Sequence, residues 1–255
     1  MEKLSKSPLV MVLAQVRFAP VLQIQKFIPD LQEELRKNGF PHFVEEQVQE
    51  LVFGGTVPPV RSSSRWIFGA PDWRKTVVFS QDFVVIETSD YDRFETFSNE
   101  FEKILNLAKE KIDLGRSERI GLRYVNLIRG QKSKSPYLFL RQEMRGFSAV
   151  EFGDVKSVQS TCLSQAITDV GRLLVRAVHT DDGSHIPPEL ASTKLQFPDK
   201  PKPGEQISFL DIDHNGEFPG DFDVSALIAE LGKLHQYSDI TFEKAVTPEA
   251  LELWK

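Results

Sequence analysis

The residues best suited to chemistry gather near the middle of the chain. Residues 119–128 read RIGLRYVNLI, and two further basic residues follow within four positions. Arginine binds phosphate or carboxylate groups through paired hydrogen bonds, and tyrosine and asparagine add directional hydrogen bonds. The candidate binding residues of this stretch are Arg119, Arg123, Tyr124, Asn126, Arg129 and Lys132.

The same stretch predicts a strand, because apolar residues fill most of its other positions. Side chains alternate between the two faces of a strand, so Arg123 and Tyr124 cannot serve one pocket directly. A purely structural interpretation stays open beside the binding site. In it, Arg123 pairs with an acidic residue on a helix, Tyr124 fills the core, and Asn126 ties down a bend.

The region 116–145 is the one locally basic part of the chain. It contains eight lysines and arginines but only two acidic residues, Glu118 and Glu143, and Tyr137 and Phe139 lie among them in the sequence. Basic patches with aromatic residues bind nucleic acid through phosphate contacts and base stacking. A solvated loop that follows a strand is the alternative interpretation.

Oxygen ligands for a metal are densest between residues 211 and 217, which read DIDHNGE. Asp211, Asp213 and the Asn-Gly pair resemble the start of a calcium loop, but the glutamate that such a loop needs would stand where Phe222 is. A strand followed by an Asn-Gly turn explains these residues as well. We therefore predict no metal site, with Asp211, Asp213 and His214 as the alternative metal ligands.

No other constellation predicts catalysis. His235 adjoins the apolar face of a predicted helix and is expected to be a packed histidine with one hydrogen bond. Cys162 lies among apolar residues of a predicted strand and is expected to be inert. The sequence holds no P-loop, no Gly-x-Gly-x-x-Gly, no Cys-x-x-Cys and no His-Glu-x-x-His. We expect no catalytic residue and no cofactor, although an unfamiliar enzyme stays open.

Composition favours an ordinary globular protein. The chain has 255 residues, a formal net charge of −6 and 40% hydrophobic residues. This charge argues against attraction of the whole surface to nucleic acid or to an anionic membrane. A single cysteine and the lack of a membrane-length apolar segment predict a cytosolic location without membrane association.

Periodicity places these candidates in an α+β fold. We expect strands at 8–18, 65–69, 76–80, 83–88, 119–128, 158–167, 172–179 and 206–213. We expect helices at 24–35 with a kink or start at Pro29, at 94–112, at 136–147, at 224–242 and from 248 onward. Residues 40–60 favour at most a short helical turn, and 181–205 a long loop.

This order repeats as strand, helix, three strands, helix. It predicts two similar halves, 1–115 and 116–255, the second with a C-terminal helical extension, joined as one compact unit. An antiparallel sheet would carry the helices on one face and leave the other face for binding.

Several segments accompany the central strand. They are residues 8–18, Trp66 with Phe68, Tyr91 before FETF at 94–97, LDID at 210–213, Leu234 with His235, Phe242, and TPEA at 247–250. Together with RIGLRYVN at 119–126, they resemble a sporadically distributed bacterial family of uncharacterised proteins with an R-I-G-L-R-Y-x-N strand motif. The resemblance covers nearly the whole chain. It implies no established activity, and the patchy distribution implies mobile or defence-linked gene neighbourhoods.

We therefore predict a non-enzymatic binding or regulatory module of the bacterial cytosol. It would act in a defence or toxin–antitoxin system through a partner protein, or as a homo-oligomer. The alternative is a nucleic-acid or nucleotide binding protein, or a nuclease component, that uses 116–145. A metal-dependent enzyme around residues 211–214 is a third hypothesis.

Overall fold

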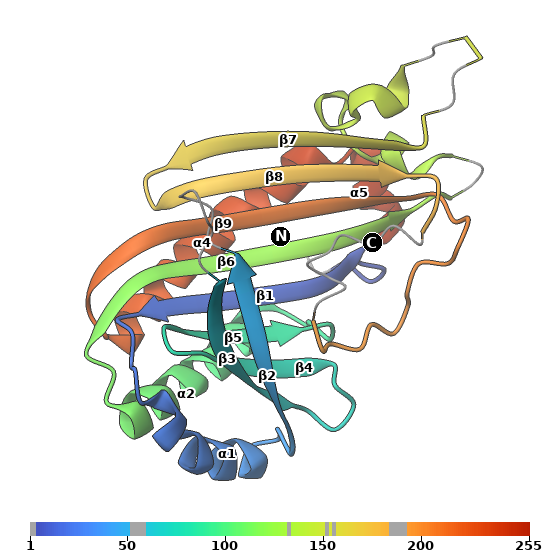
Figure 1. The fold of residues 1–255 in the computed structure, drawn as a ribbon. Coiled ribbons are helices and arrows are strands. Elements are labelled where there is room, and N and C mark those ends of the chain that lie inside the picture. The colour runs from blue at the N-terminus through green and yellow to red at the C-terminus, as the bar shows by residue number, and fades with distance from the viewer. Residues whose placement is uncertain (1–3, 52–59, 132–133, 151–152, 155–156, 184–192) are drawn as a thin grey trace.

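A computed structural model describes residues 4–51, 60–131, 134–150, 153–154, 157–183 and 193–255. Within these residues, nine strands form one antiparallel sheet (Figure 1) in the order β2-β3-β4-β5-β1-β6-β9-β8-β7. The strands are β1 (Leu9–Phe18), β2 (His42–Leu51), β3 (Val60–Gly69), β4 (Lys75–Phe79), β5 (Phe83–Thr88), β6 (Arg116–Arg129), β7 (Gln159–Thr168), β8 (Gly171–Thr180) and β9 (Ile207–Asp221). The predicted antiparallel sheet is confirmed.

Four α-helices accompany the sheet in the described part of the chain. They are α1 (Ile28–Lys37), α2 (Phe94–Ile112), α4 (Val224–Ala245) and α5 (Pro248–Trp254). Short 3-10 helices are η1 (Ile24–Lys26), η2 (Pro136–Phe139), η3 (Gln142–Met144) and η4 (Gly146–Ala149). No helix of the described residues is both long and apolar enough to cross a membrane.

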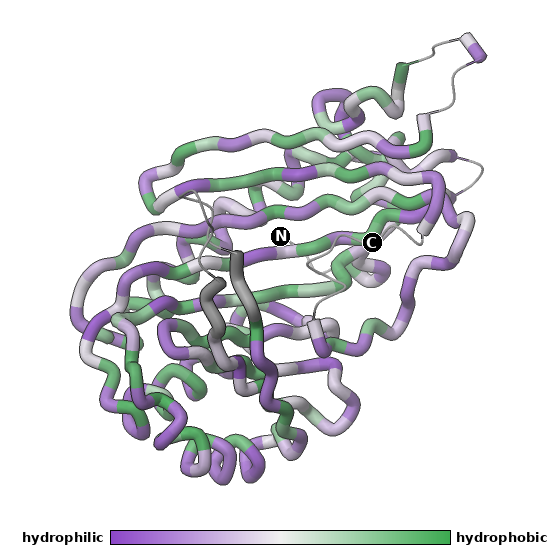
Figure 2. Tube along the Cα trace, viewed as in Figure 1, coloured by the Kyte–Doolittle hydropathy of each residue, from purple (hydrophilic) through white to green (hydrophobic). Residues whose placement is uncertain are grey.

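The main core lies between the helices and one face of the sheet, which we call the helix side. Val12, Ala14, Val16 and Phe18 of β1 point into it together with the apolar stripes of α1, α2 and α4. Figure 2 shows the alternation behind this packing as green and purple segments along α1 and the strands. A second cluster continues the same layer, where Trp254 of α5 packs beside Ile128 of β6. Burial of these stripes holds the helices on the sheet.

The opposite face of the sheet, which we call the far side, holds two smaller apolar clusters. Met11, Val125 and Phe209 pack there against Leu195 and partly buried Phe197 of the segment 193–201. Val44 of β2 packs on a second cluster beside Leu13 of β1, and Figure 1 shows β2 and β3 running steeply across the front of the sheet. The far side is therefore partly covered by irregular chain and a hairpin rather than by helices.

Four sequence predictions need correction. Residues 42–51 form β2 rather than a helical turn. The strand β9 continues through Asn215 and Gly216 to Asp221 rather than turning there. Residues 136–149 form three separate 3-10 helices. Four strands separate α1 from α2, while three strands separate the 3-10 helices from α4, so the two halves differ in element order.

Candidate functional site

The strand β6 presents its polar side chains to two different sides, as alternation predicted. Tyr124 belongs to the helix-side core, whereas Arg123 is paired with Asp213 in the ladder and bonds with Asp211 on the far side. The motif therefore supplies two separate environments, and each has its own chemistry.

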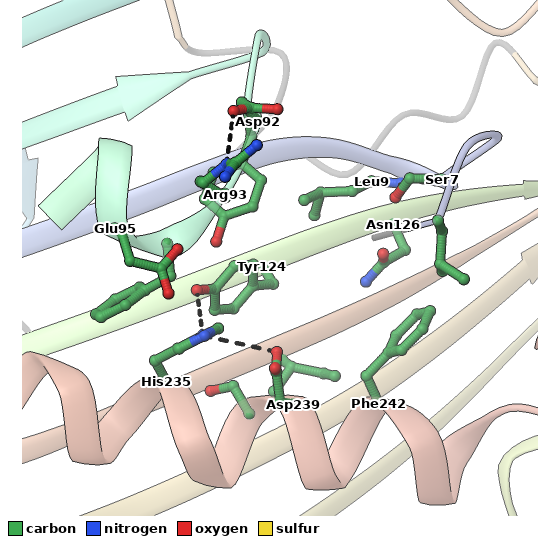
Figure 3. A pocket seen from close by; sticks show the side chains of 15 residues that line it. Ser7, Leu9, Asp92, Arg93, Glu95, Tyr124, Asn126, His235, Asp239 and Phe242 are labelled. Carbon is green, nitrogen blue, oxygen red and sulfur yellow. Dashed lines mark hydrogen bonds and ion pairs between the residues drawn. The ribbon is translucent and has the colours of Figure 1, made fainter. Parts of the chain in front are cut away.

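On the helix side, Tyr124 and Asn126 open into a pocket of about 260 Å³. Figure 3 shows it between the start of α2, the strand β6, the helix α4 and the segment 4–9. The lining residues are Leu4, Ser7, Leu9, Tyr91, Asp92, Arg93, Phe94, Glu95, Tyr124, Asn126, Ile212, His235, Ser238, Asp239 and Phe242.

Local structure explains why these side chains converge. Helix α2 begins after Arg93, whose backbone is extended, so Phe94 and Glu95 stand in the first turn above β6. In α4, His235 and Asp239 are four residues apart and share one helix face. The segment 4–9 forms the fourth wall of the pocket. It is held at both ends, because Lys6 N–H donates to Trp254 O and Leu127 N–H donates to Pro8 O.

A hydrogen-bonded pair lies at the centre of the pocket. The Tyr124 hydroxyl is 2.8 Å from His235 Nδ1, and Asp239 Oδ1 is 3.6 Å from the same nitrogen. The His235 ring stacks on Phe94 with 4.0 Å between ring centroids. The Tyr91 ring stands edge-on to Tyr124 at 5.9 Å.

Burial fixes the protonation of this pair. Burial lowers the pKa of His235, although the carboxylates of Asp239 and Glu95 act on this pKa in the opposite direction. It raises the pKa of Tyr124 well above its ordinary range, and the pKa of Tyr91 to about 12. At neutral pH His235 is therefore uncharged, and the imidazole tautomer decides whether the Tyr124 O–H or the His235 Nδ1–H is the donor. The predicted packed histidine with one hydrogen bond fits this geometry.

Asn126 lies beside an irregularity of the neighbouring strand. Its Nδ2 donates to Leu210 O at 3.2 Å. The register of β1 shifts opposite it, because Leu9 pairs with Asn126 while Met11 pairs with Val125. The extra residue, Val10, makes a β-bulge, which bends β1 at the rim of the pocket.

The far side of β6 carries a closed ion cluster. Arg123 donates two hydrogen bonds to Asp211, at 2.7 and 2.8 Å. Arg176 of β8 reaches the same carboxylate at 2.8 Å. Only 3% of Asp211 is exposed. The partner of Arg123 is thus an acid on a neighbouring strand, and the expectation of a helix acid is wrong.

A second carboxylate, Glu87, lies near this cluster. It accepts hydrogen bonds from Thr193 Oγ1 at 2.7 Å and from Thr76 Oγ1 at 3.1 Å. Burial raises its pKa, although Arg65 and Arg123 oppose the shift. Two threonine hydroxyls therefore hold the Glu87 carboxylate on the far side.

The remaining arginine candidates do not join either environment. Arg129 holds the loop after β8, with contacts of 2.8 Å to Glu205 and 2.9 Å to Asp199. Arg119 is half-buried and forms no ion pair with the described residues. Lys132 lies outside the described residues.

Internal contacts also occupy much of the basic region. Lys134 pairs with Glu249 at 2.7 Å. Arg141 donates to Val246 O, and Arg145 donates to Leu140 O and Leu138 O. These side chains hold the 3-10 segment against neighbouring chain, and they do not form an open basic patch.

The alternative metal ligands are also separated. Asp211 lies on the far side, whereas His214 is fully buried on the helix side, near Thr168 Oγ1 at 2.9 Å. No group of three or more potential ligands meets the geometry of a metal site among the described residues.

Comparison with protein-family models, with curated proteins and with solved structures finds no match to this chain.

The two edges of the sheet provide the remaining candidate surface. The edge strand β7 reads QSTCLSQAIT and contains no charged residue, proline or glycine. Its Leu163 and Ile167 are 60% and 78% exposed. The opposite edge strand, β2, has the same length but carries Glu45, Glu46 and Glu50.

Sequence reasoning missed several residues of the pocket. Glu95 and Asp239 were not candidates, because each is one acid among many on an amphipathic helix. The signal that could have found them is their spacing from aromatic neighbours: Phe94 precedes Glu95, and His235 precedes Asp239 by one helical turn.

Proposed function

We propose that the chain is a non-enzymatic binding and regulatory module that acts through a partner protein. In this proposal, the partner adds an extended segment to the exposed edge of β7. The observation that carries it is the ten-residue, uncharged edge strand with two exposed apolar side chains.

The backbone of β7 supplies the attraction. The strand pairs with β8 over all ten residues, and no described strand pairs with its other edge. Every second residue of an antiparallel edge directs its N–H and C=O away from the sheet. An added strand satisfies these groups, which is the basis of recognition by strand addition.

The contrast with β2 supports a binding role for β7. Natural proteins protect edge strands with charges, prolines or bulges, because an open edge pairs with other chains. The sequence places three glutamates on β2. An unprotected β7 is explained if a partner covers it.

Side chains on β7 would add specificity. Leu163 and Ile167 both project to the far side, opposite Arg176 and Arg172 of β8. A partner strand with apolar residues at alternate positions would pack on the two exposed side chains, and an acidic residue of that strand would meet Arg172, because Arg176 is already bonded to Asp211.

Matched substitutions on the two edges test this function. After affinity capture from the native host, the purified partner is titrated calorimetrically against wild type, Gln165→Lys on β7 and Gln47→Lys on β2. We expect Gln165→Lys to weaken binding by about tenfold or more, and Gln47→Lys to leave it within about twofold. Hydrogen exchange should show protection of β7 amides in the complex.

Two results would contradict the proposal. One is equal binding by both variants, which would place the partner elsewhere. The other is a failure to find any partner while the purified protein turns over a substrate.

The wider setting is also part of the proposal. Kinship with the bacterial R-I-G-L-R-Y-x-N family would place the module in the cytosol, within a defence or toxin–antitoxin system. We further propose that its two halves meet where β1 pairs with β6. On one side of this pair the sheet continues with β5, β4 and β3 and then the edge strand β2, and on the other side it continues with β9, β8 and β7.

Nucleic-acid binding through 116–145 is less well supported, because Arg123, Arg129, Lys134, Arg141 and Arg145 make internal contacts. Anisotropy titration with labelled RNA and DNA at low salt would restore that hypothesis if it showed saturable binding that weakens steeply with salt.

A further inference from the structure

The exposed part of β7 lies toward the end of the strand. Near its start, Phe147 N–H of η4 donates to Ser160 Oγ, and Cys162 Sγ–H donates to Glu143 O. Residues 163–167, which read LSQAI, are all exposed. Figure 1 shows β7 as the outermost strand of this side of the sheet. This five-residue stretch is therefore the part of the edge that another strand can reach.

The two exposed apolar residues of this stretch stand symmetrically about Gln165. Leu163 precedes it by two positions and Ile167 follows it by two, so all three side chains project to the same side of the sheet. If two copies of β7 pair antiparallel about a twofold axis at Gln165, Leu163 of each copy lies opposite Ile167 of the other. The strand is therefore complementary to itself.

Other antiparallel registers lose this match. A twofold axis at Leu163 would place Ile167 opposite Gln159, and an axis at Ile167 would place Leu163 beyond the end of the second strand. An axis at Ser164 or Ala166 would place both apolar residues opposite polar ones. Apolar side chains directly opposite each other stabilise a sheet, so the first register is favoured.

Charge does not oppose this self-pairing. The strand β7 has no charged residue. The nearest arginines on the same side, Arg172 and Arg176, lie opposite it on β8. Between two paired copies, Arg176 and Arg172 of the second copy would be three strand spacings apart, about 14 Å. This exceeds the screening length of about 8 Å at physiological ionic strength.

We propose that β7 of a second copy of this chain covers the edge when no other partner is bound, with the twofold axis at Gln165. Two copies would then share one continuous sheet, and the exposed apolar side chains of both would gather around the axis. The inference rests on the proposed strand addition at β7 and names its occupant in the free protein. Because both use the same edge, partner binding and self-association exclude each other.

Sedimentation equilibrium of the full chain tests the self-association with matched edge variants. Gln165→Lys would bring two ammonium groups together at the axis, whereas Gln47→Lys places the same charge on the opposite edge of the sheet. We expect the wild type to form dimers at about 100 µM, Gln165→Lys to weaken dimerisation by about tenfold or more, and Gln47→Lys to leave it within about twofold. A wild type that stays monomeric up to about 1 mM would overturn the proposal. Equal dimerisation by the two variants would also overturn it.

Two double variants test the register. Leu163→Lys with Ile167→Glu places opposite charges face to face between the copies, while Leu163→Lys with Ile167→Lys places like charges there. We expect the first double variant to dimerise about tenfold or more tightly than the second. Equal affinities would overturn the twofold axis at Gln165. Thermal unfolding of each variant confirms that lost dimerisation does not result from misfolding.

The outcomes separate this inference from the proposed partner binding. A monomeric wild type whose captured partner is still weakened by Gln165→Lys would reject self-pairing and keep the partner site. A dimer that Gln165→Lys breaks, with partner binding unaffected by the same change, would keep self-pairing and reject the partner site at β7.

Discussion

The two sides of β6 accommodate buried polar side chains in different ways. Both carry polar side chains into a largely buried layer. On the far side, Arg123 and Arg176 enclose Asp211, and the charges neutralise one another. On the helix side, Tyr124 and His235 make one hydrogen bond beside a cavity that stays open. A closed ion cluster holds strands together, whereas incompletely packed polar groups leave room for a ligand.

The largest expected effect on stability comes from a single substitution on the far side. Asp211→Asn removes the carboxylate shared by two arginines, and it should lower the free energy of unfolding by about 3 kcal/mol, because both cations stay largely buried. Urea denaturation measures the loss.

Asp239→Asn is the matched change on the helix side. Its side chain is 30% exposed and its histidine neighbour is uncharged at neutral pH. We expect a change in unfolding free energy below about 1 kcal/mol, the range for a partly exposed ion pair. Similar losses in the two variants would contradict the division into a structural and a binding side.

Acidification should destabilise the helix side. Burial lowers the pKa of His179, His214 and His235, and all three face the helix side. The unfolded chain binds protons at these groups more readily than the folded chain does. Stability is therefore retained above the ordinary histidine pKa of about 6.5 and is lost as pH falls below it.

Glu87 on the far side should have the opposite effect on stability as pH falls. Its raised pKa means that the folded state takes up a proton before the unfolded state does, so this group alone favours folding as pH falls. Urea denaturation between about pH 7.5 and 5.5 should show a net loss of stability, because three histidines oppose one carboxylate. Glu87→Gln should make that loss steeper. A stability that rises over this range would contradict the assignment.

A comparably small effect is expected for the central hydrogen bond of the pocket. Tyr124→Phe should cost about 1 kcal/mol of unfolding free energy. A rise in the pKa of His235 would identify the Tyr124 O–H as the donor, and a fall would identify the His235 Nδ1–H as the donor. An NMR titration measures this pKa. Tyr91→Phe is the comparison, because the Tyr91 side chain hydrogen-bonds with Tyr124 and does not contact His235 in the same way, and it should shift the pKa of His235 less than Tyr124→Phe does.

Periodicity predicted the elements that a single buried face defines. The apolar stripe of α2, the hairpin of β7 and β8, and the Thr247 cap of α5 were all legible, because each depends on residues close in sequence. The division of β6 into two sides followed from alternation alone. The predicted binding residue Tyr124 lines the pocket.

The missed features depend on distant residues. In β2, the valines are four residues apart, a spacing that fits a helix turn as well as one face of a strand. Pairing with β3 decides between them. The partner of Arg123 lies 88 positions away, and the partner of Tyr124 lies 111 positions away. No local pattern reports such contacts.

The wall formed by residues 4–9 affects local dynamics as well as the shape of the pocket. Leu4, Ser7 and Leu9 close one side of the pocket, while backbone hydrogen bonds at Lys6 and Pro8 tie the segment to α5 and β6. A molecule bound in the pocket would contact this segment, so filling the pocket should slow the local fraying of residues 4–9. We expect the amide of Lys6 to exchange with solvent more slowly once the pocket is filled.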